Sequence, residues 1–326
     1  MKGISIIICC YNSTQRLEKT IGSIANQQNP LDIALEVVVV DNNSSDGTFT
    51  FAEKMLSATG LAYKVVPESN PGLSLARKCG VYNSKFEYII FCDDDNWLNE
   101  DYITVAYNIM ESDKNLAACG GQGIPAFDRI KPSWFDTYSA CFALGDQSES
   151  VQHHELYGAG LVVRREILLN IYNLGFHSLL SDRKGSHLSS GGDTELTVLF
   201  KLLGYNLAYS KGLKFVHFMS EERLQWNYLK ALFIGFGSGG PYIHIYREVG
   251  KGETSDTFIW IKLFLKALVK AIYFSVLPPK TNSRSIYWLW SKAYIGALWK
   301  IKSDESISVK KICTFIDQYK KMHRTQ

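Results

Sequence analysis

The sequence carries little net charge and has no cysteine spacing typical of a metal or redox motif. Lys and Arg number 35 against 32 Asp and Glu, a formal net charge of +3 over 326 residues, and no long basic block precedes the C-terminal third. This balance argues against a nucleic-acid partner. The seven cysteines, an odd number, lack a CxxC pair and stand mostly in apolar sequence. We therefore expect reduced, buried thiols in a cytoplasmic protein.

Two glycine-rich fingerprints and a secretion leader are also missing. The sequence contains neither GxGxxG nor GxxxxGK[ST], which excludes the usual dinucleotide motif and the P-loop. The apolar run at 4–10 is at the short limit for a signal-peptide core, and no small-residue cleavage site follows it at 11–13. This run predicts a buried first strand. The length suits one large domain, or one domain with an appendage.

Apolar runs of strand length alternate with helix-patterned segments over the first hundred residues. The expected strands are 4–10, 35–40, 62–66 and 88–92, and the expected helices are 16–28, 49–58 and 74–82. Continuous apolar strands joined by helices predict an α/β fold, with a Rossmann-like, mostly parallel sheet and helices on both faces. Ligands of such sheets bind just beyond the carboxyl ends of the strands.

Polar residues cluster at those strand ends. The clusters are Tyr11 with Asn12, residues 41–47, residues 70–72 ahead of Arg77, and the triplet Asp93, Asp94 and Asp95. Helix capping explains Asn12 or Asp46 taken singly, but four clusters at one rim favour a nucleotide pocket. Asp93 and Asp95 fall on one side of the strand and Asp94 on the other. Two such carboxylates can hold a ribose and a divalent metal on a diphosphate.

The order and spacing of these motifs resemble the family 2 glycosyltransferases, which have a GT-A fold. The matching segments are 5–8 with Tyr11 and Asn12, 39–48, 70–72 with Ala76 and Arg77, 91–95, and 191–196, followed by His217 and Arg223. The resemblance covers residues 3–225. It implies an inverting, nucleotide-sugar-dependent enzyme of the hexosyltransferase type.

The resemblance also implies roles in a donor pocket. Asp41 would hold the base and Asp93 the ribose, and the remaining pocket residues would be Tyr11, Asn12, Asn43, Arg77 and Asp94. Asp95 would bind Mg²⁺ or Mn²⁺ on the diphosphate, with His217 as a further metal or diphosphate contact. A lone histidine after a strand-like segment is otherwise a hydrogen-bonded core residue.

Asp193 would be the general base for the acceptor hydroxyl. It stands at the start of a helix expected over 194–203, so N-capping is its alternative role, and one residue can serve both. The family often has Glu before this aspartate. Gly192 stands there instead, which leaves the role of Glu195 open.

The C-terminal third changes character. Residues 257–277 are long enough, at ~1.5 Å per residue, to cross a ~30 Å hydrocarbon layer. However, Lys262, Lys266 and Lys270 would each cost roughly 2.5–3.5 kcal/mol at full depth. Their four-residue spacing places them on one arc opposite an apolar face, which predicts a helix lying in the interface of an anionic membrane. The aromatic and lysine-rich segment 286–301 also suits the headgroup zone.

The sequence thus predicts a GT-A catalytic domain over 1–225 and a helical membrane-associating region over 226–326. Within the first, 1–100 would be the nucleotide-binding half and 101–225 the acceptor half. The predicted activity is metal-dependent sugar transfer to a lipid-linked or glycan acceptor in cell-surface polysaccharide synthesis, peripheral on the inner face of the cell membrane.

Alternatives to this interpretation stay open. One is a catalytically silent nucleotide-sugar-binding subunit that recruits a partner to the membrane. Another is a nucleotidyltransferase, although that class usually has a Gly-rich basic loop after its first strand, which 10–13 lacks. The C-terminal helices could instead pack on the catalytic domain or on a second copy of the chain in a homo-oligomer.

Overall fold

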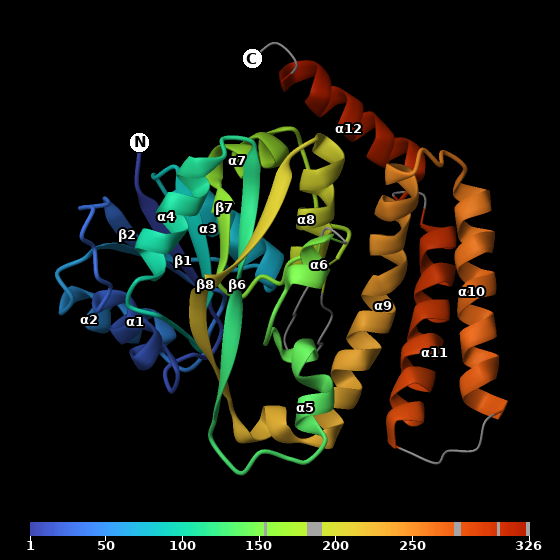
Figure 1. The fold of residues 1–326 in the computed structure, drawn as a ribbon, viewed down its shortest axis with the longest axis horizontal. Coiled ribbons are helices and arrows are strands. Elements are labelled where there is room, and N and C mark those ends of the chain that lie inside the picture. The colour runs from blue at the N-terminus through green and yellow to red at the C-terminus, as the bar shows by residue number, and fades with distance from the viewer. Residues whose placement is uncertain (153–154, 181–190, 277–281, 305–306, 324–326) are drawn as a thin grey trace. The chain divides into compact units, whose positions relative to one another are not determined.

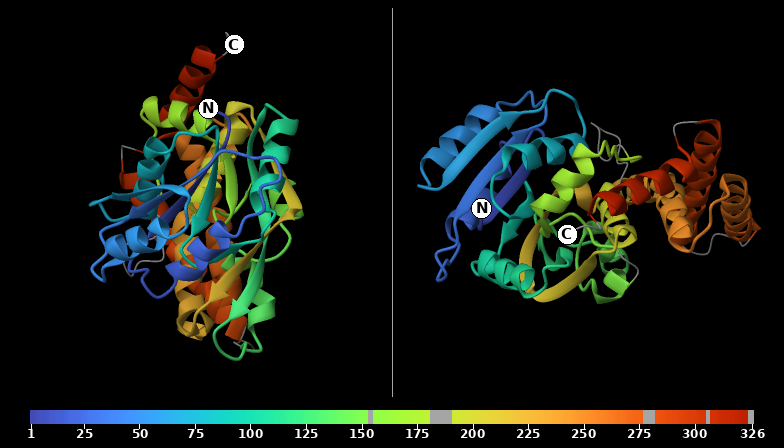
Figure 2. Two further views of the ribbon diagram at one scale, coloured as in Figure 1. Left: turned by 90° about the vertical axis from the view of Figure 1, so that its left-hand side faces the viewer. Right: turned by 90° about the horizontal axis from the view of Figure 1, so that it is seen from above.

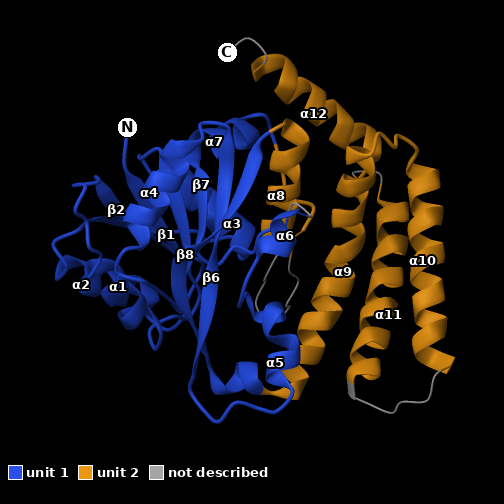
Figure 3. Ribbon diagram, viewed as in Figure 1, with its two compact units in different colours: residues 1–175, 205–224 blue, residues 176–204, 225–326 orange. Residues whose placement is uncertain are grey.

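The computed structural model describes residues 1–152, 155–180, 191–276, 282–304 and 307–323 (Figure 1). The chain forms two compact units, coloured separately in Figure 3. Unit 1 comprises 1–175 and 205–224, and unit 2 comprises 176–204 and 225–326. Segment 176–204, which contains Asp193, therefore belongs to the same compact unit as the C-terminal helices. The functional division at residue 225 stays a prediction.

Unit 1 is built on an eight-stranded sheet with the order β3-β2-β1-β4-β7-β6-β8-β5. The strands are β1 (Ile4–Cys10), β2 (Leu35–Asp41), β3 (Ala62–Pro67), β4 (Tyr88–Asp93), β5 (Asn96–Leu98), β6 (Leu116–Phe127), β7 (Leu161–Arg164) and β8 (Asn206–Met219). Strands β3, β2, β1 and β4 are parallel, and β7 is antiparallel to both β4 and β6. The two longest strands, β6 and β8, run parallel side by side, as Figure 1 and the turned views of Figure 2 show. The predicted α/β, mostly parallel architecture is confirmed.

The three helices that the apolar pattern predicted, over 16–28, 49–58 and 74–82, are present in unit 1 among others. The helices of this unit are α1 (Leu17–Ala25), α2 (Thr48–Ser57), α3 (Leu73–Asn83), α4 (Tyr102–Ser112), α5 (Phe135–Tyr138), α6 (Ser148–Gln152) and α7 (Arg165–Asn173), with 3-10 turns η1 (Ser139–Phe142) and η2 (Glu221–Leu224). Helix α1 stops before the predicted end at 28. The Gln28 amide donates to the Glu100 carbonyl at 2.6 Å and the Gln27 side chain bonds the Asn99 carbonyl, so contacts from far along the chain end the helix.

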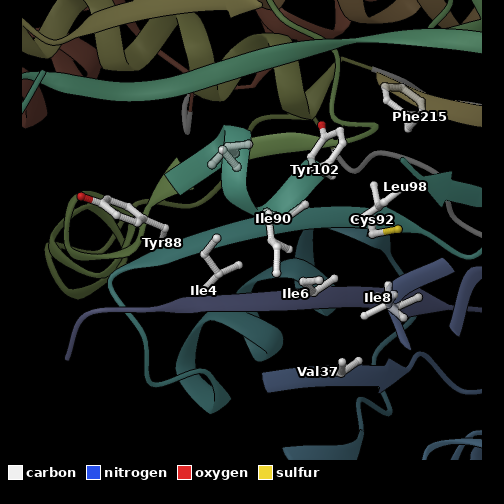
Figure 4. Packing of buried hydrophobic residues seen from close by; sticks show 14 of the residues in the cluster. Ile4, Ile6, Ile8, Val37, Tyr88, Ile90, Cys92, Leu98, Tyr102 and Phe215 are labelled. Carbon is white, nitrogen blue, oxygen red and sulfur yellow. The ribbon is translucent and has the colours of Figure 1, made fainter. Parts of the chain in front are cut away.

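The core of unit 1 explains why β1 is continuously apolar. Ile4, Ile6 and Ile8 are fully buried in one cluster with Ile90 of β4 and Tyr102 of α4 (Figure 4). The intervening side chains of β1 are buried as well. A strand covered on both faces has no position left for a polar side chain except where a specific partner exists. In β1 the exception is Ser5, whose hydroxyl donates to Glu36 Oε1 at 2.7 Å.

Unit 2 is helical in the part of the chain that is described. Its helices are α8 (Gly192–Leu203), α9 (Trp226–Gly250), α10 (Asp256–Val276), α11 (Asn282–Ser303) and α12 (Val309–His323). Helices α9, α11 and α10 lie side by side (Figure 1). A Cβ on Gly237 of α9 would lie 2.4 Å from the Trp290 carbonyl oxygen of α11, so glycine permits this close approach.

The two C-terminal helices expected from the sequence are present. The segment predicted over 257–277 forms α10, with residue 277 outside the described residues, and that predicted over 286–301 forms α11. Among the described helices, none has the length and apolarity needed to span a bilayer.

Candidate functional site

The carboxyl ends of three neighbouring parallel strands form one rim in unit 1. In the register of the sheet, Cys10 of β1 stands beside Asp41 of β2, and Cys9 stands beside Asp93 of β4. The turn after β1 begins with Tyr11. The structure therefore brings Asp41, Tyr11 and Asp93 to one edge, because parallel strands end on the same side of a sheet.

The turn after β1 and the loop after β2 hold each other in place. The Asn12 amide donates to Ser44 Oγ at 3.0 Å, and Asn12 Oδ1 accepts from the Ser45 amide at 2.9 Å. Asn12 and Asn43 both adopt left-handed backbone, with φ of 51° and 61°, a conformation that asparagine tolerates better than most residues. This backbone shapes the rim, while the Tyr11 ring remains half exposed.

Two residues of the second loop are structural. Asp46 Oδ1 accepts from the Thr48 amide at 3.0 Å at the start of α2, although Gly47 rather than Asp46 occupies the N-cap position. Burial opposes ionisation of Asp46, but hydrogen bonds from Thr48 and Thr14 outweigh it and lower its pKa. Asn42 was not singled out in the sequence. Its Nδ2 donates to the Asn70 carbonyl and its Oδ1 accepts from the Gly72 amide, both at 2.7 Å, which ties the 70–72 loop to the rim.

Arg77 of α3 lies almost buried at this rim. Its guanidinium stands 5.4 Å from the centre of the Phe91 ring. A Cβ on Gly158 would lie 2.3 Å from Arg77 Nη2, so only glycine lets the guanidinium pack against the chain there. The structure thus gives Gly158 a concrete role, that of making room for a buried cation.

The three adjacent aspartates have different surroundings. Asp94 accepts from Arg16 Nη2 at 2.6 Å and from Ser13 Oγ. Burial and the neighbouring Asp95 charge raise the pKa of Asp94, although Arg16 counteracts them. The Asp94 carboxylate is therefore engaged within the protein and supports the rim from behind. Asp93, at the last position of β4, is partly exposed.

Asp95 meets His217 through strand pairing. Asn96 of β5 stands directly opposite His217 of β8, so residues more than a hundred positions apart become neighbours. His217 Nε2 lies 3.4 Å from Asp95 Oδ1. Arg223 of η2 contacts both, with Nη2 at 2.5 Å from Asp95 Oδ2 and Nη1 at 2.7 Å from His217 Nε2. The Asp95 side chain is only 2% exposed.

This pair can supply part of a metal site. Within the described residues, no group of three or more His, Cys, Asp or Glu is arranged to hold an ion. Magnesium sites that include substrate phosphates often need only one or two protein carboxylates. Asp95 and His217 offer one oxygen and one nitrogen ligand, so they fit an ion shared with a diphosphate, provided that the Arg223 guanidinium moves aside.

The acidic motif at the start of α8 lies in unit 2. Gly191 occupies the N-cap position, so Asp193 is in the first turn rather than at the cap, and its Oδ1 accepts from the Thr194 amide at 2.8 Å. The Asp193 side chain is partly exposed. A carboxylate in the first turn is stabilised by the helix dipole.

Glu195 differs sharply from Asp193. It is fully buried, and its carboxylate accepts from Ser178 Oγ, from the Leu179 amide at 2.9 Å and from the Tyr246 hydroxyl at 2.9 Å. Burial nevertheless raises the pKa of Glu195 to about 7. Glu195 therefore joins α8, the segment before it and α9 in unit 2. These contacts give Glu195 a structural role.

Sequence reasoning did not identify three contributions to the site. They are those of Arg16 and Asn42, and the contact of Arg223 with both Asp95 and His217. Arg16 looks like an ordinary surface charge at a helix start, and Asn42 is one of several polar residues in its loop. The signal that could have indicated Arg16 and Arg223 was the aspartate triplet at 93–95, because three adjacent carboxylates require cations from elsewhere in the chain.

The known proteins that the chain resembles in sequence include glycosyltransferases. The chain is 30% identical over 116 residues to a cholesterol galactosyltransferase of Borreliella burgdorferi, covering 36% of this chain and 31% of that protein. It is 34% identical over 116 residues to the uncharacterized glycosyltransferase YfnE of Bacillus subtilis, covering 36% and 29%. The matched part of the chain thus spans about a third of the length of these relatives.

Two solved structures share the fold. The mannosyltransferase PcManGT from Pyrobaculum calidifontis, in complex with GDP-Man and Mn²⁺, has a TM-score of 0.59 at 17% identity, over 92% of this chain and 88% of that one. S. aureus TarS 1-349 in complex with UDP-GlcNAc has a TM-score of 0.53 at 16% identity, over 97% and 89%. The family model for glycosyl transferase family 2 matches residues 5–171. The chain therefore belongs to glycosyl transferase family 2.

Proposed function

We propose that this chain transfers a hexosyl group, with inversion, from a nucleoside diphosphate sugar to an acceptor hydroxyl. The observation that carries the proposal is the rim of unit 1, where Asp41 and Asp93 flank the end of β1 and the Asp95–His217 pair follows. Membership of a glycosyltransferase family supports it, as do the nucleotide sugars in complex with two proteins of the same fold.

Each rim residue has a role that suits its chemistry. Asp41 accepts hydrogen bonds from the base, Asp93 accepts them from the ribose hydroxyls, and Tyr11 stacks on the base. Arg77, held between Phe91 and Gly158, contributes positive charge near the diphosphate. Asn12, Asn43 and Asp94 complete the pocket: Asn12 Oδ1 accepts from the loop after β2, and Asp94 pairs with Arg16.

The transfer needs one base and no enzyme nucleophile. The acceptor oxygen bonds to the anomeric carbon as the bond from that carbon to the β-phosphate oxygen breaks. The diphosphate leaves with the electron pair, and Asp193 takes the proton of the hydroxyl. Attack opposite the leaving group inverts the anomeric carbon.

Asp95 and His217 would hold a divalent cation, Mg²⁺ or Mn²⁺, together with the diphosphate. When bound, such an ion acts as a Lewis acid that stabilises the charge of the leaving group. The Mn²⁺ named with GDP-Man in PcManGT supports this assignment.

Substitution of the base tests the enzymatic part. With Mn²⁺ and a panel of UDP-, GDP- and TDP-hexoses, Asp193→Asn should lower transfer or donor hydrolysis by about 10²–10⁴-fold while donor binding, measured by calorimetry, persists. Asp317→Asn, an exposed position of α12, is the matched control. Equal turnover in the Asp193 variant would remove this residue from its role, and absence of turnover in the parent protein with donor binding intact would favour the silent binding subunit.

We further propose that α10 docks on an anionic membrane, where a lipid-linked acceptor in polysaccharide synthesis would be met from the cytoplasmic side. An outward stripe of α10 is exposed although apolar; it comprises Phe258, Ile261, Leu265, Leu268, Val269, Ile272 and Val276. Contiguous exposed apolar side chains mark interaction sites. Lys266 and Lys270 are exposed on the same helix and supply charge complementary to anionic headgroups.

The lysine spacing predicted an apolar face that includes Trp260 and Phe264. The exposed apolar face of α10 differs from it in part. Trp260 and Phe264 stack on each other and contact Trp299 of α11, so they are partly covered. Lys262 is turned toward the buried Glu248 and pairs with it. The membrane would therefore meet the stripe defined above.

Vesicle flotation tests the docking face. The full chain should float with vesicles containing phosphatidylserine, and the double variant Leu265→Glu, Ile272→Glu should lose this binding, because it places two carboxylates in the stripe. Ile130→Glu, at a 95% exposed apolar position of unit 1, is the control. Unchanged flotation of the double variant would refute docking through α10.

A further inference from the structure

One guanidinium bridges the two residues assigned to the metal. Arg223 Nη2 lies 2.5 Å from Asp95 Oδ2, and Nη1 lies 2.7 Å from His217 Nε2. The three side chains are 15%, 2% and 5% exposed, respectively, so the contact is largely shielded from water. Charge-assisted hydrogen bonds in such surroundings are strong.

The contact defines which nitrogen of His217 carries the proton. A guanidinium has donors only, so His217 Nε2 must accept the hydrogen bond from Arg223. The neutral ring then carries its proton on Nδ1, a buried atom with no hydrogen-bond partner in the described part of the chain. An unprotonated Nε2 is the form that ligates a metal. Arg223 therefore occupies the atoms of His217 and Asp95 that would face a metal ion.

The same atoms cannot serve the guanidinium and a metal ion together. A cation on Asp95 and His217 must displace Arg223, whose charge lies at a mostly buried position. Moving that charge away from a carboxylate is costly unless another anion replaces it. The diphosphate of the donor is such an anion, and planar guanidinium groups bind phosphate oxygens through paired donors.

We propose that Arg223 occupies the place of the divalent cation until metal and donor arrive together, and then transfers to the diphosphate. The inference rests on the proposed function, since it assumes the donor pocket. It follows that metal alone binds weakly, that nucleoside diphosphate strengthens metal binding, and that metal strengthens nucleotide binding by the same factor. Arg223 is thus a positioning residue for the free protein and a diphosphate contact in the complex.

Metal binding without turnover provides the test. Free Mn²⁺ is titrated into the full chain and followed by electron paramagnetic resonance, with and without saturating UDP or GDP. Arg223→Met should raise the affinity for Mn²⁺ alone by about tenfold or more, because the competing charged hydrogen bonds are gone. The same variant should bind UDP or GDP more weakly in the presence of Mn²⁺, and the coupling between the two ligands should fall toward unity.

Two further variants complete the design. Arg129→Met removes an arginine paired with the exposed Glu221 and should leave every constant unchanged. Arg223→Lys retains the charge but cannot bridge both acceptors, so it should show the same changes to a smaller degree, and it replaces the methionine variant if circular dichroism shows that the latter is unfolded.

The outcomes separate this inference from the proposed function. Equal Mn²⁺ affinity in the parent protein and the folded Arg223 variants, with UDP or GDP still bound in a metal-dependent way, overturns the inference alone. Absence of any UDP or GDP binding by the parent protein, with or without Mn²⁺, removes the donor pocket and the inference with it.

Discussion

The strand-end rim of unit 1 and the outward stripe of α10 in unit 2 differ in which side chains they bury. The rim buries charged side chains, whereas the stripe exposes apolar ones. At the rim, two adjacent carboxylates have charged partners, Arg16 for Asp94 and Arg223 for Asp95. On α10, apolar side chains such as Leu265 and Val269 face outward. Burial of paired charge is expensive and indicates a site built around a charged ligand, whereas exposed apolar surface indicates a partner that removes it from water.

The largest expected effect separates the two faces of α10. Leu263 is 3% exposed and Leu265 is 54% exposed. Leu263→Ala should lower the free energy of unfolding by about 2–5 kcal/mol, because it leaves a cavity, whereas Leu265→Ala should change it by less than about 0.5 kcal/mol. Urea unfolding followed by fluorescence measures both. Similar losses of unfolding free energy for the two variants would show that the apolar stripe of α10 is packed rather than exposed, contrary to the comparison with the rim.

The second prediction concerns buried charge within unit 2. Burial raises the pKa of Glu195 from 4.5 to about 7. The folded protein therefore retains a proton that the unfolded chain has released between these values, so this residue makes the free energy of unfolding fall, by up to about 3 kcal/mol, as the pH rises from 4.5 to 7.

Glu195→Gln should remove that pH dependence. Unfolding free energies measured in urea at pH 5, 6, 7 and 8 give the slope, and the exposed Glu222→Gln serves as the control that keeps it. A slope unaffected by Glu195→Gln would mean that the carboxylate is already ionised at pH 5, and that unit 2 tolerates buried charge as the rim does.

The third prediction tests whether the ion pair between Asp94 and Arg16 stabilises the rim. Asp94→Asn removes the ion pair with the partly buried Arg16 and should lower the free energy of unfolding by about 2 kcal/mol, while metal-dependent UDP or GDP binding is retained. Asp136→Asn removes a surface ion pair with Lys131 and should cost less than about 0.5 kcal/mol. Loss of nucleotide binding without loss of stability in Asp94→Asn would place this residue in contact with the donor instead.

The smallest expected effect comes from a single methyl group at the rim. Gly158→Ala places a Cβ 2.3 Å from Arg77 Nη2, so the guanidinium must shift and the affinity for UDP or GDP should fall by about tenfold. In Gly22→Ala of α1 the added Cβ meets nothing within 4 Å, so stability should rise by about 0.5–1 kcal/mol with nucleotide affinity unchanged. Calorimetric titration and thermal unfolding measure the two effects. Unaltered affinity in Gly158→Ala would exclude Arg77 from the donor pocket.

Much of unit 1 could be predicted from local pattern. The strands at 4–10 and 88–92 and the helices at 49–58 and 74–82 are where apolar periodicity indicated, and the carboxyl-end rule placed Asp41 and Asp93 at one edge. The periodicity also predicted α10 and α11. These predictions succeeded because a strand buried on both faces and an amphipathic helix each leave a repeat in neighbouring residues.

Pairing between distant residues could not be read in the same way. No pattern in the sequence around Asp94 identifies Arg16 as its partner. Likewise, no pattern around Asp95 predicts that β5 pairs with β8, which brings His217 and Arg223 to it. Likewise, the lysine spacing on α10 indicated amphipathicity, but the packing of Trp260 and Phe264 on α11 decided which apolar side chains remain outside.

By itself, the order of residues determined the element types, the family resemblance and the presence of carboxylates beyond the strands, since these depend on side-chain chemistry and short-range periodicity. The tertiary structure alone decided the order of strands in the sheet, the guanidinium groups that pair with Asp94 and Asp95, and the face of α10 that stays exposed. The physical reason is that these features depend on contacts between segments far apart in the chain, whose choice is made by the packing of the whole unit rather than by any local repeat.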